Sequence, residues 1–129
     1  MKFAAAALFA TLATPALAAP DWHGVWRNQA NTVHIQAAPC GSAMCGTVVW
    51  ASDKAKADAA RGGTATLVGK RLFDGFVPAG DGWNGQVFVP DLNVSVAGTL
   101  TMPDRNTLVG TGCILANVGC RSVTWLRVK

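Results

Sequence analysis

The side chains that could carry chemistry in this 129-residue chain are two histidines, seven acids and four cysteines. A nucleophilic hydrolase needs a nucleophile beside a base, and a zinc protease needs paired histidines on one helix face. Neither a Gly-x-Ser-x-Gly nor a His-Glu-x-x-His string occurs, and His23 and His34 lie on separate β-like segments. His34 alternates with Thr32 and Gln36, which predicts an exposed face. We therefore predict no catalytic residue and no metal ligand, and an enzyme is the least favoured class.

The acids are all aspartates, and they read as turn formers. Asp74 and Asp81 are the pair that could perform acid–base chemistry, and 80–85 faintly resembles a cation-binding loop. Both aspartates adjoin glycine, however, as is typical of tight turns, and nothing fixes their separation. The further acidic ligands of a cation loop are missing from 80–85. We predict no cofactor.

The four cysteines form two closely spaced pairs, Cys40 with Cys45 and Cys113 with Cys120. Each pair flanks a short glycine-containing loop between β-like runs, and facing residues of an antiparallel hairpin are close enough for a disulfide. Neither spacing is Cys-x-x-Cys, which argues against a redox pair or a zinc site. We expect the disulfides Cys40–Cys45 and Cys113–Cys120. Crosswise pairing stays open, because the longer loops that it would close stabilise more on the chain-entropy model.

Residues 1–18 have the features of a secretory signal peptide, with a lysine at the start, an apolar middle and small residues at the exit. Residues 19–129 then form a single domain. No later run approaches the roughly 18 apolar residues of a membrane helix. We expect an exported protein, periplasmic or secreted, without a transmembrane segment after cleavage.

Composition and charge limit the classes of binding partner that the sequence favours. Half of the residues are hydrophobic (50%) and only 14% are charged, which indicates a folded globular domain. The formal net charge is +4, and the basic residues are scattered without forming a stripe. Nucleic acid is therefore an unfavoured partner.

Short strands separated by turn residues dominate the pattern. Segments 32–37 and 93–100 alternate polar and apolar residues, as expected of half-buried strands. Further strands are predicted at 23–28, 46–51, 71–77, 86–89, 107–114 and 121–128.

Short turns favour consecutive antiparallel pairing, and closure of about eight strands removes both sheet edges. The sequence thus predicts an all-β, closed, up-and-down β-barrel. Segment 52–62, with Ser52 as N-cap and Gly62 at its end, predicts one short helix or loop insertion that carries no core.

The first and last strands of such a barrel are neighbours. Gly24 and Trp26 belong to the first, and Trp125 and Arg127 to the last. We expect these four residues to close the barrel, with Arg127 over the Trp26 indole in a cation–π contact.

This Gly-x-Trp and last-strand Arg arrangement resembles that of lipocalin-like (calycin) barrels. Over nearly all of 19–129, the chain also resembles the bacterial domain-of-unknown-function family 2147. The matching residues are Gly24-x-Trp26, Cys40 to Cys45-Gly46, Val48-Val49-Trp50, Gly69 before Leu72-Phe73, Trp83-x-Gly85-x-Val87-x-x-Pro90, Leu108-x-Gly110-x-Gly112-Cys113 and Trp125-x-Arg127. Met44 replaces a larger aliphatic residue, and Phe88 and Ser95 replace tyrosines. The resemblance implies an exported lipocalin-like barrel and no particular reaction.

A barrel of eight strands has an interior that side chains fill or that holds one small ligand. Core packing is the ordinary role of aromatic side chains, but an open mouth lined by them would form an apolar pocket. The residues predicted for that pocket are Trp50, Phe73, Phe76, Trp83 and Phe88. We expect a module that binds a small hydrophobic ligand in the envelope. The alternative is a structural or interaction protein with a filled barrel, presenting loop 53–63 to an envelope protein.

Overall fold

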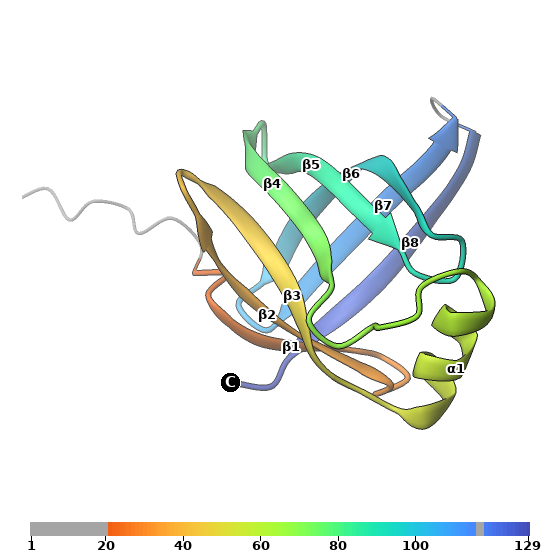
Figure 1. Cartoon of the computed structure of the whole chain (residues 1–129). Coiled ribbons are helices and arrows are strands. Elements are labelled where there is room, and N and C mark those ends of the chain that lie inside the picture. Colours follow the sequence, from red (N-terminus) through yellow and green to blue (C-terminus); the bar gives the residue numbers. More distant parts are fainter. Residues whose placement is uncertain (1–20, 116–117) are drawn as a thin grey trace, which may run out of the picture.

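The computed structural model describes residues 21–115 and 118–129, so the predicted signal peptide at 1–18 lies outside the described residues. The described chain forms eight strands and one helix (Figure 1). Their bounds are β1 Gly24–Asn28, β2 Val33–Cys40, β3 Ala43–Ala51, α1 Asp53–Arg61, β4 Arg71–Ala79, β5 Gly82–Val89, β6 Val94–Asp104, β7 Thr107–Leu115 and β8 Val118–Arg127.

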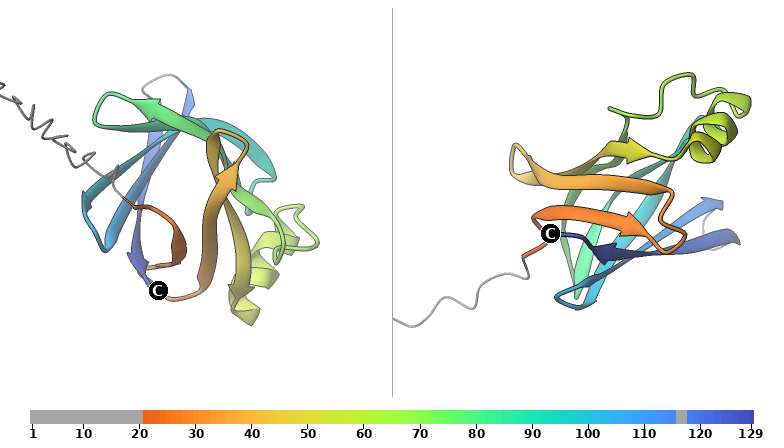
Figure 2. Two further views of the ribbon diagram at one scale, coloured as in Figure 1. Left: turned by 90° about the vertical axis from the view of Figure 1, so that its left-hand side faces the viewer. Right: turned by 90° about the horizontal axis from the view of Figure 1, so that it is seen from below.

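The strands form a closed antiparallel barrel in which each pairs with the next and β8 pairs with β1. This confirms the predicted all-β, up-and-down barrel. The connections after β1, β3 and β5 lie at one end, together with α1, and we call this the helix end. The connections after β2, β4 and β6 lie at the opposite end, where the C-terminus also lies (Figures 1 and 2).

Several strands are longer than predicted. β3 begins at Ala43, β5 begins at Gly82 and β6 continues to Asp104. The cause is the tightness of the turns: only Gly80 and Asp81 separate β4 from β5, so the ladder continues to the tip of the hairpin. Gly80 adopts the left-handed backbone (φ 56°) that such a turn requires.

The insertion after β3 is a helix, and it begins and ends as predicted. The Ser52 Oγ accepts a hydrogen bond from the Ala55 N–H at 3.1 Å, and the Gly62 N–H donates to the last helical turn. The expectation that this segment carries no core is wrong. Ala59 is fully buried, because a side chain this small allows the helix backbone to approach the barrel.

Gly62 and Thr64, which both follow α1, attach the helix to the turn between β5 and β6. The Thr64 hydroxyl, which is buried, donates to the Pro90 carbonyl at 2.8 Å. A Cβ on Gly62 would overlap the backbone of Asp91, so the helix terminus lies directly against this turn. α1 lies at the margin of the barrel in both views of Figure 2.

The barrel interior is filled toward the opposite end. Its fully buried side chains include Trp26, Ile35, Met44, Phe76, Leu100 and Leu108. Toward the helix end, residues on the same inner faces become exposed to solvent. Along β6, Leu100 is fully buried whereas Val94, predicted to share its face, is 42% exposed. The barrel is therefore packed at one end and hollow at the other.

Candidate functional site

An apolar cavity of about 400 Å³ opens at the helix end of the barrel. Its walls come from β4, β5, β6, β7 and β8 and from the turn between β5 and β6. Leu92 of that turn, Ile114 of β7 and Val123 of β8 line it and remain 55%, 62% and 44% exposed. The cavity thus presents an apolar surface to solvent.

Glycines at inward positions keep this part of the barrel hollow. Gly110 and Gly112 on β7 line the cavity, and Gly110 faces Val123 in the ladder with β8. A Cβ on Gly110 would lie 3.3 Å from the Leu100 side chain and 3.8 Å from the Phe73 ring. Larger residues here would extend the packed core into the cavity.

The alternation of β8 brings one charged side chain into the apolar wall. Gly119, Arg121, Val123 and Trp125 all line the cavity, every second residue of the strand. Among the described residues that line it, Arg121 is the only base and Asp91 the only acid. The ion pairs found within the described ranges include neither of them.

The five residues predicted for a pocket have different locations. Phe73 and Phe88 line the cavity, and the Phe73 ring is edge-on to that of Trp125, with centroids 5.6 Å apart. Phe76 and Trp83 are buried in the packed core. Trp50 lies on the outer face, 44% exposed, with its ring 4.7 Å from that of His34. Only Phe73 and Phe88 are therefore brought together at the cavity.

The sequence did not predict that other residues of β7 and β8 would line the cavity. Arg121 and Val123 belong to a polar-looking stretch of the last strand, and Gly110 and Gly112 carry no side chain to suggest a pocket. The available signal was the period of two along β8, which places Arg121 on the same face as the buried Trp125.

The four residues predicted to close the barrel lie along the seam between β1 and β8. The Arg127 guanidinium carbon lies 4.3 Å from the centroid of the Trp26 ring. The Trp26 indole N–H donates to the Trp22 carbonyl at 2.9 Å. Gly24 adopts a φ of 132°, and a Cβ there would overlap the Lys129 carbonyl, while Trp125 lines the cavity from β8.

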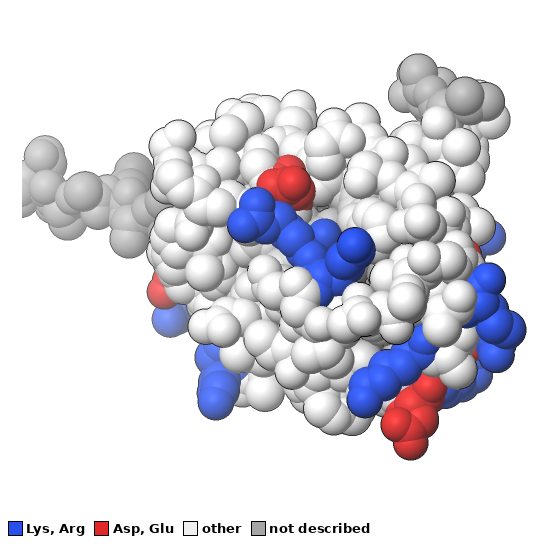
Figure 3. Space-filling model, viewed as in Figure 1, with Lys and Arg blue, Asp and Glu red and all other residues white. Residues whose placement is uncertain are grey.

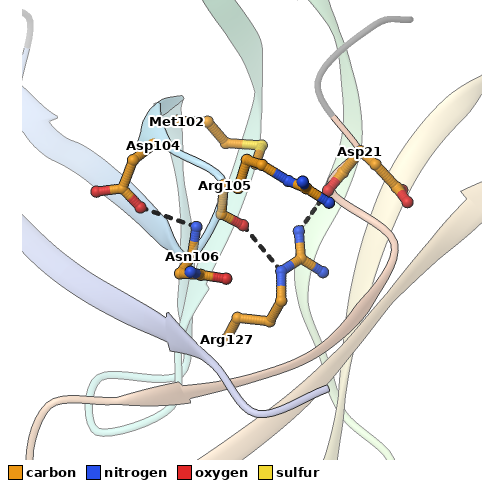
Figure 4. Close-up of a pocket in the computed structure, with 6 residues that line it drawn as sticks. All are labelled: Asp21, Met102, Asp104, Arg105, Asn106 and Arg127. Carbon is orange, nitrogen blue, oxygen red and sulfur yellow. Dashed lines mark hydrogen bonds between the residues drawn. The ribbon is translucent and has the colours of Figure 1, made fainter.

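A second pocket, of about 440 Å³ and polar lining, lies at the opposite end around Arg127 (Figure 4). The Arg127 Nε donates to the Arg105 carbonyl at 2.8 Å, and Nη1 donates to the His23 carbonyl at 2.7 Å. Nη2 donates to the Asp21 carbonyl. Because this guanidinium already donates to three carbonyls of its own chain, we interpret the pocket as the place where Arg127 holds the segment before β1 and the turn between β6 and β7 together.

Charged groups elsewhere form local pairs. A hydrogen bond from His23 lowers the pKa of Asp21, and a hydrogen bond from Lys54 lowers the pKa of Asp58. Asp74 accepts from Arg71 at 3.2 Å. In the view of Figure 3, Lys and Arg form separate groups with acidic side chains beside several of them.

The structure confirms the local cysteine pairing. The Cα atoms are 5.7 Å apart in Cys40–Cys45 and 4.0 Å apart in Cys113–Cys120. Cys40–Cys45 joins β2 to β3 at the opposite end. Cys113–Cys120 joins β7 to β8 at the helix end, beside the cavity residues Ile114 and Gly119. Only the second disulfide supports the cavity wall.

Fold and site together define a small, closed, eight-stranded β-barrel protein with an apolar cavity at one end. The family model described as an uncharacterized protein conserved in bacteria (DUF2147) matches residues 24–127, and the chain belongs to this family. Comparisons with curated proteins and with solved structures each gave no match. Within the described residues, no helix has both the length and the apolar character needed to cross a bilayer.

Proposed function

We propose that this protein binds a small apolar ligand in the cavity at the helix end, in the manner of a lipocalin-like barrel. The observation that carries the proposal is the uncovered apolar wall around a cavity of about 400 Å³. That volume lies within the range of roughly 300–1,000 Å³ that is usual for small-molecule sites.

The energetics of the exposed wall support the proposal. Burial of apolar surface stabilises by about 25 cal/mol per Å². A ligand that covers Ile114 and Val123 would recover free energy that the unliganded barrel forgoes at these positions. The hollow helix end also favours ligand binding over the alternative of a partner-binding protein, because that alternative assumed a filled barrel.

We propose binding rather than catalysis at this site. The described residues that line the cavity include no histidine, serine or cysteine. Acid–base or nucleophilic catalysis relies on two or more reactive groups held close together, and among the described lining residues Asp91 is the only carboxylate. The lining instead has the mainly apolar character of a binding pocket.

We also propose that the protein is exported to the periplasm. Two disulfides support this location, since disulfides persist mainly in oxidising compartments. The test is mass spectrometry of the protein isolated from an envelope fraction. An N-terminal peptide that begins at Ala19 is expected, and a peptide that retains Lys2 would contradict export with cleavage.

The binding proposal is tested by filling the cavity from β8. Val123→Trp places an indole opposite Gly110, inside the cavity. Ser122→Trp is the matched control, because Ser122 directly precedes Val123 in β8 and its hydroxyl lies 2.8 Å from that of Thr111 on the exposed outer face. The probe is N-phenylnaphthylamine, a neutral dye that fluoresces in apolar sites.

We expect the dye to bind the unmodified protein and Ser122→Trp alike. In Val123→Trp its affinity should fall by about tenfold or more, which corresponds to at least about 1.4 kcal/mol. Equal binding by all three proteins, or binding by none, would overturn the proposal. Circular dichroism of each variant establishes that it is folded.

A further inference from the structure

We propose that the ligand is a single-chain amphiphile with an anionic head group, whose chain occupies the cavity and whose head lies at Arg121. This inference rests on the function proposed above and specifies its ligand class. A carboxylate and a phosphate ester share the chemistry in question, a negative charge on oxygens that accept hydrogen bonds from a guanidinium.

The position of Arg121 carries the inference. Arg121 lies on the cavity-facing side of β8, two residues from Val123, and it pairs in the ladder with Gly112 of β7. Gly112 has no side chain that would cover the guanidinium. Arg121 is itself exposed, so it lies where the cavity meets solvent. A ligand chain against Val123 would end with its head group beside this arginine.

The local charges favour an anion over a cation. No described carboxylate forms an ion pair with Arg121. A second cation is near, since the Lys70 ammonium lies 5.0 Å from the ring centroid of Phe88, a residue that lines the cavity. Asp91 is the one acid among the described residues of the lining. Lys70 is not itself among the described lining residues, so the preference for an anion rests on Arg121, with which no described carboxylate forms an ion pair.

The cavity volume favours one chain over two. At about 400 Å³, the cavity is near the lower limit of the usual range of roughly 300–1,000 Å³. The glycine-lined wall of β7 also presents a smooth surface without polar side chains, as an alkyl chain requires. Arg121 of β8, the one base among the described lining residues, is exposed and so lies at the mouth of the cavity.

The experiment compares ligands of equal chain length and different head groups. Dodecanoate, dodecyl phosphate and dodecanol compete with bound N-phenylnaphthylamine, and the measured quantity is the affinity of each acid relative to that of the alcohol. This ratio is determined for the unmodified protein, for Arg121→Gln and for Arg121→Lys. Arg105→Gln is the matched control, because it removes the same charge at the opposite end of the barrel.

We expect Arg121→Gln to lower the ratio for at least one acid by up to about fivefold, the upper end of the effect of an exposed charge pair. Arg121→Lys and Arg105→Gln should largely retain it. Added salt should reduce the ratio in the unmodified protein by screening the pair.

The two proposals fail in different ways. If no dodecyl compound and no dye binds, the proposed function itself is wrong. If the dye and dodecanol bind while both ratios are the same in Arg121→Gln as in the unmodified protein, the cavity binds ligands but Arg121 does not select their head group. An equal fall in Arg105→Gln would also overturn the inference, since it would indicate a general effect of net charge.

Discussion

Substitution of Gly62 by alanine tests how α1 is held at the helix end. Gly62 has a φ of −82°, which any residue adopts, so alanine carries no backbone penalty at this position. Its Cβ, however, would overlap the carbonyl oxygen, carbonyl carbon and Cα of Asp91. The predicted effect is therefore steric and arises where the helix meets the turn between β5 and β6.

The magnitude follows from which atoms overlap. Backbone atoms cannot rotate away as a side chain can, so either the turn or the helix must shift. Overpacking of this kind costs about 1–3 kcal/mol. A shift would also break the hydrogen bond from Thr64 to the Pro90 carbonyl, whose loss adds about 1 kcal/mol. We expect Gly62→Ala to lower the free energy of unfolding by about 2–4 kcal/mol.

Urea unfolding followed by tryptophan fluorescence, with both disulfides intact, measures this loss. Gly75→Ala is the control, because Gly75 has a φ of 68° and no atom within 4 Å of its would-be Cβ. That variant suffers only backbone strain, about 1–2 kcal/mol. If Gly62→Ala unfolds at the same urea concentration as the unmodified protein, α1 does not pack against the turn as described.

Two further predictions concern the seam and the disulfides. Arg127→Gln removes the cation over Trp26 and its bonds to three carbonyls, and should lower the free energy of unfolding by about 1–3 kcal/mol in urea titrations. Replacing either Cys40–Cys45 or Cys113–Cys120 by a serine pair should cost about 2 kcal/mol, because both close short loops. Dye binding should weaken in the variant that lacks Cys113–Cys120 and stay unchanged in the variant that lacks Cys40–Cys45. Equal weakening in both variants would contradict the placement of Cys113–Cys120 in the cavity wall.

The fold could be predicted because its signals are local. Alternating residues identify strands, and short turns force consecutive strands to pair. Gly24-x-Trp26 and Trp125-x-Arg127 mark the first and last strands, so they locate the seam where the barrel closes. The burial of Ala59 escaped prediction because an alanine in a charged helix gives no apolar signal.

The cavity was harder to predict because it depends on register. Trp50 pairs with His34 and lies on the same outer face of the barrel. The register of the ladder between β2 and β3 shifts between His34 and Ile35. Trp83 pairs with Leu100, which places it in the packed part of the barrel and not at the mouth. An aromatic residue in a strand therefore does not reveal on its own whether it fills a barrel or lines its opening.

The packed and hollow ends of the barrel are physically linked. Each large side chain that is fully buried toward the opposite end, such as Trp26 or Phe76, stabilises the fold by roughly 1.5–3 kcal/mol. That stability allows Gly110 and Gly112 to leave a cavity at the helix end. A ligand that binds only the folded barrel adds stability in proportion to the logarithm of its concentration above its Kd. A bound ligand opposes local opening of the cavity wall as well as global unfolding, so hydrogen exchange of the amides around Gly110 and Gly112 should slow on binding, and unchanged exchange there would contradict binding in this cavity.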